Sequence, residues 1–384
     1  MTQTATNNNS SFLGKMRRGA QRCLYALSNP TFLYIVKRIL SALLTLLLLI
    51  SVVTALIRLM PDTKFYDVQM YNKIRGNNPE VAETWKNHQL YLYGIRDLDG
   101  NPRSVFTSIF TYIYWLLPIP KVVPTAWKDW TCEILIDPFV GGTYFGKSIS
   151  YNVPVTTLLT SRMGISMAIS LTSTFLAYLI SVPFGIAMAK KPGGTADKIG
   201  NIFVVLNYAI PAIVFYLIMQ LWFGQVDGFW GWANFGLSYT PERWWGLIPP
   251  IACVVFLSIP GISIWVRRYM VDELSSDYVK FARSKGLSER TIMYRHVLRN
   301  ACVPLIRNLP AVFIGSIVGS YYIESIWAIP GTGALLTRAL QQANPDTQLI
   351  QGLTIIYAAM SMLSFLLGDI ITIFFDPRIK LIAD

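Results

Sequence analysis

Charged residues are scarce in this chain: they make up 14% of its 384 residues, while 53% are hydrophobic. A soluble domain carries about 25% charged residues, so this shortage argues against an ordinary water-soluble fold. The formal net charge of +12 would suggest a nucleic-acid partner in a soluble protein. In a membrane protein the same excess is usually found in cytoplasmic loops, so we expect a membrane and no nucleic acid as partner.

Cysteine and histidine are also rare. The chain has four widely spaced cysteines and no C-x-x-C pair: Cys23, Cys132, Cys253 and Cys302. This spacing predicts neither a disulfide framework nor a zinc site. The two histidines, His88 and His296, match no metalloprotease pattern, and no nucleophile–base set or carboxylate pair emerges. We therefore expect no catalytic residue, metal site or cofactor site in this chain.

Long apolar runs, by contrast, are abundant. A helix needs about 20 apolar residues to cross the hydrocarbon core. Six runs meet or approach that length: Ile39–Ile57, Met163–Ala189, Ile199–Val226, Trp244–Val266, Asn308–Ile323 and Thr347–Gly368. Internal prolines in three of these runs predict kinks: Pro183, Pro211 and Pro260. The sequence thus predicts an all-α polytopic membrane protein with six transmembrane helices.

Basic residues are distributed unevenly between the loops. Residues 1–38 contain six basic residues and no acidic residue. Residues 190–198 contain three basic residues and one Asp, and residues 267–302 contain eight basic and four acidic residues. Residues 59–160 contain nine charges of each sign. Because cytoplasmic loops carry an excess of Lys and Arg, we expect both termini and the two basic loops in the cytoplasm. Residues 59–160 then lie outside.

This topology divides the chain into four parts. Residues 1–30 form a polar cytoplasmic tail that we expect to be disordered. Residues 31–58 form the first transmembrane helix, which remains as an anchor because no small-residue cleavage site follows it. Residues 59–160 form an aromatic-rich outer cap, which we expect to dock an external protein. Residues 161–384 form a core with helices two to six.

One stretch of the outer segment, GGTYFGKS at Gly141–Ser148, matches the phosphate-binding pattern G-x-x-x-x-G-K-[ST]. A true P-loop serine opens a helix, whereas Asn152 and Pro154 follow here at once. The stretch also faces a compartment with essentially no ATP. We interpret the match as a coincidence.

The basic loop 267–302 is predicted to contain a helical hairpin. Asp277 is expected to cap its first helix. The apolar side of that helix is predicted to consist of Tyr278, Phe281 and Ala282. Arg283 and Lys285 fall in its last turn, where cations complement the helix dipole.

Gly286 supplies the left-handed residue that ends this helix, and Leu287 folds back. Ser288 can cap a second helix that runs to Asn300. On pattern alone, the hairpin fits either a docking surface for another protein or a solvated basic loop that touches lipid headgroups.

At this point the sequence resembles a known family. The run DYVKFARSKGLSERTIMYRHVLRNACVP looks like the cytoplasmic loop of binding-protein-dependent ABC importer permeases, in their dipeptide, oligopeptide and nickel branch. Three other stretches agree in order: FGKSISYNVPVTTLLTSR, YIESIWAIPGTG and GDIITIFFDPRIK. The position and length of the outer segment resemble those of the first, B-type permease of a pair.

The resemblance implies a type I importer core and half of a pore in a bacterial cell membrane. Its implied partners are a second homologous permease, two ABC ATPases that bind ATP and Mg, and an extracytoplasmic peptide-binding protein. Each permease of this family docks a coupling helix on an ATPase. The residues carried over to that role are Asp277, Tyr278, Phe281, Ala282, Arg283, Lys285, Gly286 and Leu287.

The chain departs from the general importer motif E-A-A-x-x-x-G. Counted back from Gly286, the three leading positions hold Lys280, Phe281 and Ala282, so only the second Ala and the Gly match. The peptide branch commonly lacks the Glu. The departure therefore leaves the family in place, but no ion pair that depends on that Glu carries over.

Two acidic residues lie in or beside apolar runs and are candidates for function. Glu324 closes the fifth run and is a candidate for the border of the substrate entrance. Asp369 lies toward the cytoplasmic end of the sixth run, where we favour a structural pairing with Arg307 or a loop cation. Two alternatives stay open: an importer for nickel or another small solute, and a channel.

Overall fold

The computed structural model describes residues 30–97, 100–119, 124–128, 133–136, 143–225, 227–341 and 345–375. The predictions that fall outside this part concern the tail 1–29, the outward-facing Cys132, the first two glycines of the P-loop-like stretch and the end of the C-terminal signature.

Five helical segments of the described chain are long and apolar enough to cross a membrane, and a bent pair brings the number to six. Three are uninterrupted helices: α2 (Pro30–Arg58), α6 (Val155–Ala189) and α17 (Thr347–Phe375). A fourth joins η3 (Trp244–Leu247) to α9 (Ile248–Leu274). The predicted class, an all-α polytopic membrane protein, is confirmed.

The third predicted span is broken rather than kinked. Helices α7 (Thr195–Ala209) and α8 (Ala212–Gly224) meet at an angle of 90°. Proline disfavours the helical conformation of the residue before it, and Ile210 before Pro211 has extended torsions, with φ −89° and ψ 118°. The proline therefore ends one helix and begins another.

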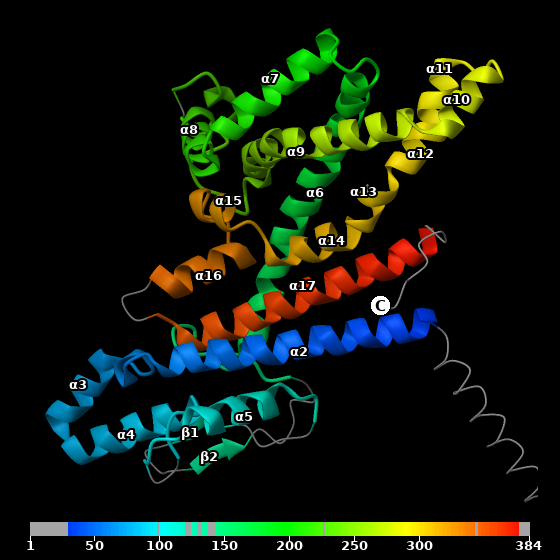
Figure 1. The fold of residues 1–384 in the computed structure, drawn as a ribbon. Coiled ribbons are helices and arrows are strands. Elements are labelled where there is room, and N and C mark those ends of the chain that lie inside the picture. The colour runs from blue at the N-terminus through cyan, green and yellow to red at the C-terminus, as the bar shows by residue number, and fades with distance from the viewer. Residues whose placement is uncertain are drawn as a thin grey trace, which may run out of the picture.

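The fifth predicted span, Asn308–Ile323, lies in the fifth apolar segment, Glu289–Ile326, and its helix is interrupted after Val318. Gly319 then has a φ of +77°, a left-handed value that glycine adopts without strain. This region is built from short helices: α11 (Glu289–Thr291), the π-helical turn η4 (Ile292–Val297), α12 (Leu298–Ala301), α13 (Val303–Arg307), α14 (Leu309–Val318), α15 (Tyr321–Ile326) and α16 (Thr332–Gln341). After the break, the chain folds back through α15 and α16 toward the start of α17 (Figure 1).

The outer segment forms a small cap of its own beside one end of α2. It contains η1 (Asp62–Lys64), α3 (Val68–Asn77), α4 (Pro79–Leu92), α5 (Val105–Leu116) and a hairpin of β1 (Pro124–Lys128) and β2 (Glu133–Ile136). Its buried residues pack on Ile57 at the end of α2: Phe65, Tyr66, Leu90 and Ile95. The all-α prediction did not include this antiparallel hairpin.

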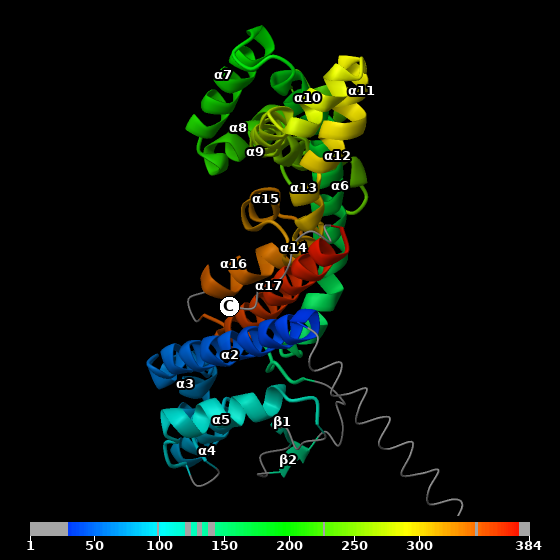
Figure 2. The same ribbon diagram turned by 45° about the vertical axis from the view of Figure 1, so that its right-hand side comes forward.

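Helices α6 and α9 form the most extensive helix pair in the described chain. A Cβ atom at Gly185 of α6 would lie 2.7 Å from the Ser263 carbonyl oxygen of α9, so glycine permits the close approach. On the other side of the molecule, α17 packs against α14 and α2 (Figures 1 and 2). The chain therefore presents two packed groups of helices joined by the long helix α6.

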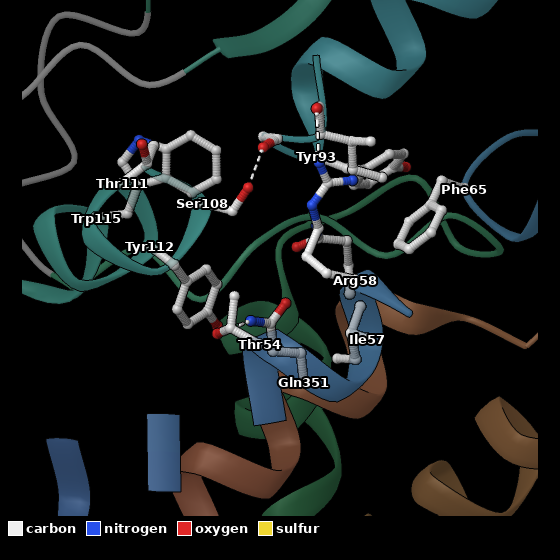
Figure 3. A pocket seen from close by; sticks show the side chains of 13 residues that line it. Thr54, Ile57, Arg58, Phe65, Tyr93, Ser108, Thr111, Tyr112, Trp115 and Gln351 are labelled. Atoms are coloured by element: carbon white, nitrogen blue, oxygen red, sulfur yellow. Dashed lines mark hydrogen bonds between the residues drawn. The ribbon is translucent and has the colours of Figure 1, made fainter. Parts of the chain in front are cut away.

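A polar junction ties the cap to α2 and α17 (Figure 3). The Gln351 side-chain amide donates to the Thr54 hydroxyl at 2.9 Å, and Arg58 donates to the carbonyls of Ile95 and Arg103 at 3.0 and 2.7 Å. These bonds close around a cavity of about 20 Å³ between the cap and the two helices. Side chains far apart in sequence thus fix the cap on the membrane-spanning part.

Candidate functional site

The predicted hairpin of the basic loop is present, but its first cap is not the predicted residue. Helix α10 (Asp277–Ser284) starts after Ser276, which is in the extended N-cap conformation. The prediction that Asp277 caps the helix was wrong, because Asp277 is already helical and pairs instead with the Lys280 Nζ at 2.8 Å. Its carboxylate still lies at the positive end of the helix dipole.

The end of α10 follows the prediction. Gly286 has a φ of +75°, and its N–H donates to the Arg283 carbonyl at 2.9 Å. The Leu287 N–H bonds back to the Ala282 carbonyl at 3.3 Å, which is the expected closure of a helix by a left-handed glycine. Ser288 then caps α11 through its hydroxyl, which accepts from the Thr291 N–H at 3.3 Å.

The buried face of α10 differs from the predicted one. Val279 and Ala282 are the buried residues of this helix, and they join a core that contains Ile186, Met270, Ile292 and Val297. Phe281 is 61% exposed. The prediction of one face formed by Tyr278, Phe281 and Ala282 was therefore wrong, because Val279, three residues before Ala282, sets the inward direction.

The surface left open at the hairpin tip is apolar and basic. The Lys285 Nζ lies 4.4 Å from the centre of the Phe281 ring, a cation–π distance, and Leu287 is 40% exposed. Arg283 binds Glu289 across the turn at 2.7 Å, and this bond raises the pKa of the Arg283 guanidinium. We define Phe281, Arg283, Lys285 and Leu287 as the hairpin tip.

Residues behind the tip hold it on the membrane helices. The Tyr278 hydroxyl donates to the Glu273 carboxylate of α9 at 2.6 Å. Burial, followed by this bond, raises the pKa of Tyr278 to about 12, so it stays a neutral donor. Lys190 at the end of α6 lies over the Tyr294 ring at 5.9 Å. The tip is thus a fixed projection of α6 and α9 rather than a loose loop.

Glu324 does not border an entrance in this structure. It lies in α15 with 1% of its surface exposed, and its carboxylate accepts from the Ser320 and Ala334 N–H groups at 3.0 and 3.1 Å. A Cβ atom at Gly319 or Gly331 would approach this carboxylate to 2.3 Å. The surroundings of Glu324 therefore require glycine and serve to close the turn between α14 and α16.

Asp369 pairs with arginine, as the sequence analysis favoured. Its two carboxylate oxygens lie 2.9 Å from the Arg307 Nη2 and 3.1 Å from the Arg38 Nη2. Arg307 was the partner that the sequence indicated, whereas Arg38 of the first helix was not anticipated. The cluster joins α2, α13 and α17 at one point.

The sequence analysis missed the buried carboxylate of Asp346. It accepts from the Ser148 hydroxyl at 2.5 Å, from the Ser150 N–H at 3.0 Å and from the Leu349 N–H at 3.0 Å. Its place directly before the sixth apolar run, where an N-cap is expected, was the available signal.

The same contacts explain the P-loop-like stretch. Ser148 is held by Asp346 and no helix begins there, since α6 starts only at Val155. In the described residues, no group of three or more His, Cys, Asp or Glu could hold a metal ion.

The chain was compared with known proteins. Residues 181–381 match the family "Binding-protein-dependent transport system inner membrane component". The oligopeptide transport system permease protein AmiC of Streptococcus pneumoniae is 35% identical over 241 residues, which cover 62% of this chain and 47% of that protein. The dipeptide transport system permease protein DppB of Lactococcus lactis is 28% identical over 353 residues, covering 91% and 99%.

The match thus spans about half the length of the first of these relatives and nearly all of the second. Among solved structures, the MetNI methionine ABC transporter in an inward-facing conformation is similar with a TM-score of 0.42 and 18% identity, over 58% of this chain and 97% of that one. Since the family match covers more than half of the chain, the chain belongs to the binding-protein-dependent transport system inner membrane components.

Proposed function

We propose that this chain is a permease subunit of a bacterial ABC importer and forms half of a pore for the uptake of oligopeptides or dipeptides. The names of its relatives support the substrate class, since AmiC and DppB are called oligopeptide and dipeptide permeases. The second half of the pore is a homologous permease. An extracytoplasmic binding protein delivers the peptide, and residues 59–160 form the cap on which it docks.

The excess of basic residues sets the proposed orientation. Both termini and the loop 267–302 lie in the cytoplasm, so the cap and the start of α17 face outward. Residues 161–384 form the core of the permease in this proposal. The chain itself holds no cofactor; ATP and Mg are bound by two ATPase subunits.

The observation that carries the proposal is the hairpin tip. An exposed phenylalanine beside a lysine and a leucine, fixed at the end of α6 and α9, fits a small apolar pocket with acidic surroundings on a partner. The rigid attachment is important, because the hairpin tip can transmit a movement of the ATPases to α6 and α9 only if it moves together with these helices. Buried Ala282 and half-buried Tyr278 support the tip from behind, and Asp277 and Gly286 define its two ends.

Phe281→Asp tests this role. The variant places a charge on the docking surface while leaving the core of Val279 and Ala282 intact, so we expect full membrane insertion with loss of the ATPases and of transport. The measurement is a mild-detergent pull-down of the tagged chain from native membranes, with partners identified by mass spectrometry. Phe229→Asp is the matched control, because Phe229 is 75% exposed but lies between α8 and α9, far along the chain from the tip.

ATPases retained by Phe281→Asp would refute the docking role. Recovery of the wild-type chain alone would favour the channel alternative, in which the Gly286 turn has no partner. Uptake assays with dipeptides, longer peptides and Ni²⁺ in the intact complex distinguish the peptide importer from the nickel or small-solute alternative.

A further inference from the structure

A cavity of about 210 Å³ lies between the first and last helices, next to Asp369. One side of its lining is polar or charged: Arg38, Ser41, Thr45 and Asp369. The other side is apolar: Ala42, Met362, Phe365 and Leu366. Helices α2 and α17 run side by side here, with the start of α2 next to the end of α17 (Figures 1 and 2). The cavity is thus amphipathic and open toward the flank of the bundle.

Among the residues that the structure describes, Asp369 is the anion paired with both Arg38 and Arg307. These three groups together carry one net positive charge. Each arginine reaches the carboxylate through its Nη2 atom, and about half of each arginine side chain remains exposed, at 50% and 53%. A guanidinium carries five N–H donors, so both groups retain capacity for a second anion.

The hydroxyl groups that line the cavity are not available to donate hydrogen bonds to an anion. The Ser41 hydroxyl donates to the Arg38 carbonyl at 2.9 Å, and the Thr45 hydroxyl donates to the Ser41 carbonyl at 2.8 Å. Their hydrogens are therefore already used along α2. An anion at this place is held by guanidinium groups, whose planar donors suit phosphate oxygens.

The apolar side extends into the lipid-facing surface. Phe365, which lines the cavity from α17, is 71% exposed. Its ring offers contact to a hydrocarbon chain that enters from the bilayer. A soluble anion such as free phosphate would use the arginines but not this surface.

We propose that the cleft between α2 and α17 binds an anionic phospholipid of the cytoplasmic leaflet, with its phosphate on Arg38 and Arg307 and an acyl chain against Met362, Phe365 and Leu366. The leaflet follows from the orientation given under the proposed function. Basic pockets between transmembrane helices on the cytoplasmic side are suited to anionic headgroups. The lipid would fill the cleft and hold the first helix on the last.

The test uses the full chain purified in mild detergent with its natural partners. Phosphatidylglycerol or phosphatidylcholine is added, and thermal unfolding is followed together with the amount of each lipid that remains bound, measured by mass spectrometry. We expect phosphatidylglycerol to raise the unfolding temperature more than phosphatidylcholine. Arg38→Gln should weaken phosphatidylglycerol binding about five-fold, which corresponds to about 1 kcal/mol for one basic residue.

Two variants separate a lipid site from a simple ion pair. Asp369→Asn removes the anion that competes for the arginines, so a lipid site predicts that phosphatidylglycerol binding is kept or strengthened. If the arginines served only as ion-pair partners, Asp369→Asn and Arg38→Gln should have the same effect. Lys37→Gln removes the same charge one position away from the cleft and should keep the lipid response. Arg38→Lys retains the charge and should bind more lipid than Arg38→Gln. This difference would show that the loss in Arg38→Gln comes from the missing charge and not from a general folding defect.

Equal effects of both lipids on the wild-type chain would overturn the proposal. So would parallel losses in Arg38→Gln and Asp369→Asn, or a response to inorganic phosphate that matches the response to phosphatidylglycerol. None of these readouts uses transport or ATPase binding. Failure of the lipid site is therefore distinguishable from failure of the importer assignment.

Discussion

The two ends of the membrane-spanning part satisfy their carboxylates in different ways. At the end next to the cap and α16, Asp346 and Glu324 are buried and accept hydrogen bonds from backbone N–H groups, and Asp346 also accepts from the Ser148 hydroxyl. At the other end, Asp369 binds two arginines whose side chains are each about half exposed. A backbone N–H group can bond a buried carboxylate only while the backbone keeps its position. A long, exposed arginine side chain can adjust to movement, and water can replace its bond.

This difference predicts unequal costs of removal. A buried N–H group that loses its acceptor costs about 1–3 kcal/mol, since water cannot replace the bond. A half-exposed ion pair contributes about 0–1 kcal/mol, because water and salt screen it. The first kind of carboxylate should therefore be far more sensitive to substitution than the second.

The largest effect is expected for Glu324→Ala. The substitution leaves the Ser320 and Ala334 N–H groups without their acceptor, so we expect a loss of about 2–6 kcal/mol in unfolding free energy. Thermal unfolding of the purified chain in detergent measures it. Glu324→Gln, which retains one acceptor oxygen, should lose less. Equal stability of the wild-type and Glu324→Ala chains would show that the buried bonds do not matter.

A much smaller effect is expected for Asp369→Asn. Its arginine partners are half exposed, so the loss should be about 1 kcal/mol or less and should diminish further in high salt. The measurement is unfolding at low and high NaCl concentration. If Asp369→Asn destabilised the chain as much as Glu324→Ala does, the proposed contrast between the two ends would be wrong.

The effect of His88 in the cap is the smallest near neutral pH and grows as the pH falls. His88 in α4 is 4% exposed, and burial lowers its pKa from 6.5 to about 4. The unfolded chain therefore takes up a proton in a range where the folded chain does not. The contribution of neutral His88 to stability is complete above pH 6.5 and declines as the pH falls from 6.5 toward 4. His88→Leu should flatten that part of the pH profile of unfolding; an unchanged slope would assign it to other groups.

Local signals in the sequence predicted local structure well. Gly286 followed by Ser288 predicted the end of one helix and the start of the next, because both roles depend on the residue itself. The direction of a helix face was not predictable in the same way. Whether Phe281 or Val279 pointed inward depended on the core supplied by α6 and α9, which lie elsewhere in the chain.

Breaks in the spans show the same limit. Pro211 predicted a kink within one helix, but the helices on its two sides, α7 and α8, meet at 90°. Glu324 was placed at an edge because the fifth apolar run ends there. The chain instead turns at the left-handed Gly319, and the residues on both sides of Glu324 enclose its carboxylate. A single glycine in an apolar run does not predict such a turn.

The bonds that join α2 and the outer segment to the last helix and the residue before it can form only late in synthesis. Thr54 and Gln351 are 297 residues apart, and Ser148 and Asp346 are 198 apart. Synthesis proceeds from the N-terminus at about 5–20 residues per second, so the first helix and the cap wait for α17 to be translated before these contacts can form. Until then the flank of α2 that α17 will cover is open to lipid and to chaperones. A ribosome that stops early would therefore leave α2 and the cap without their contacts to α17.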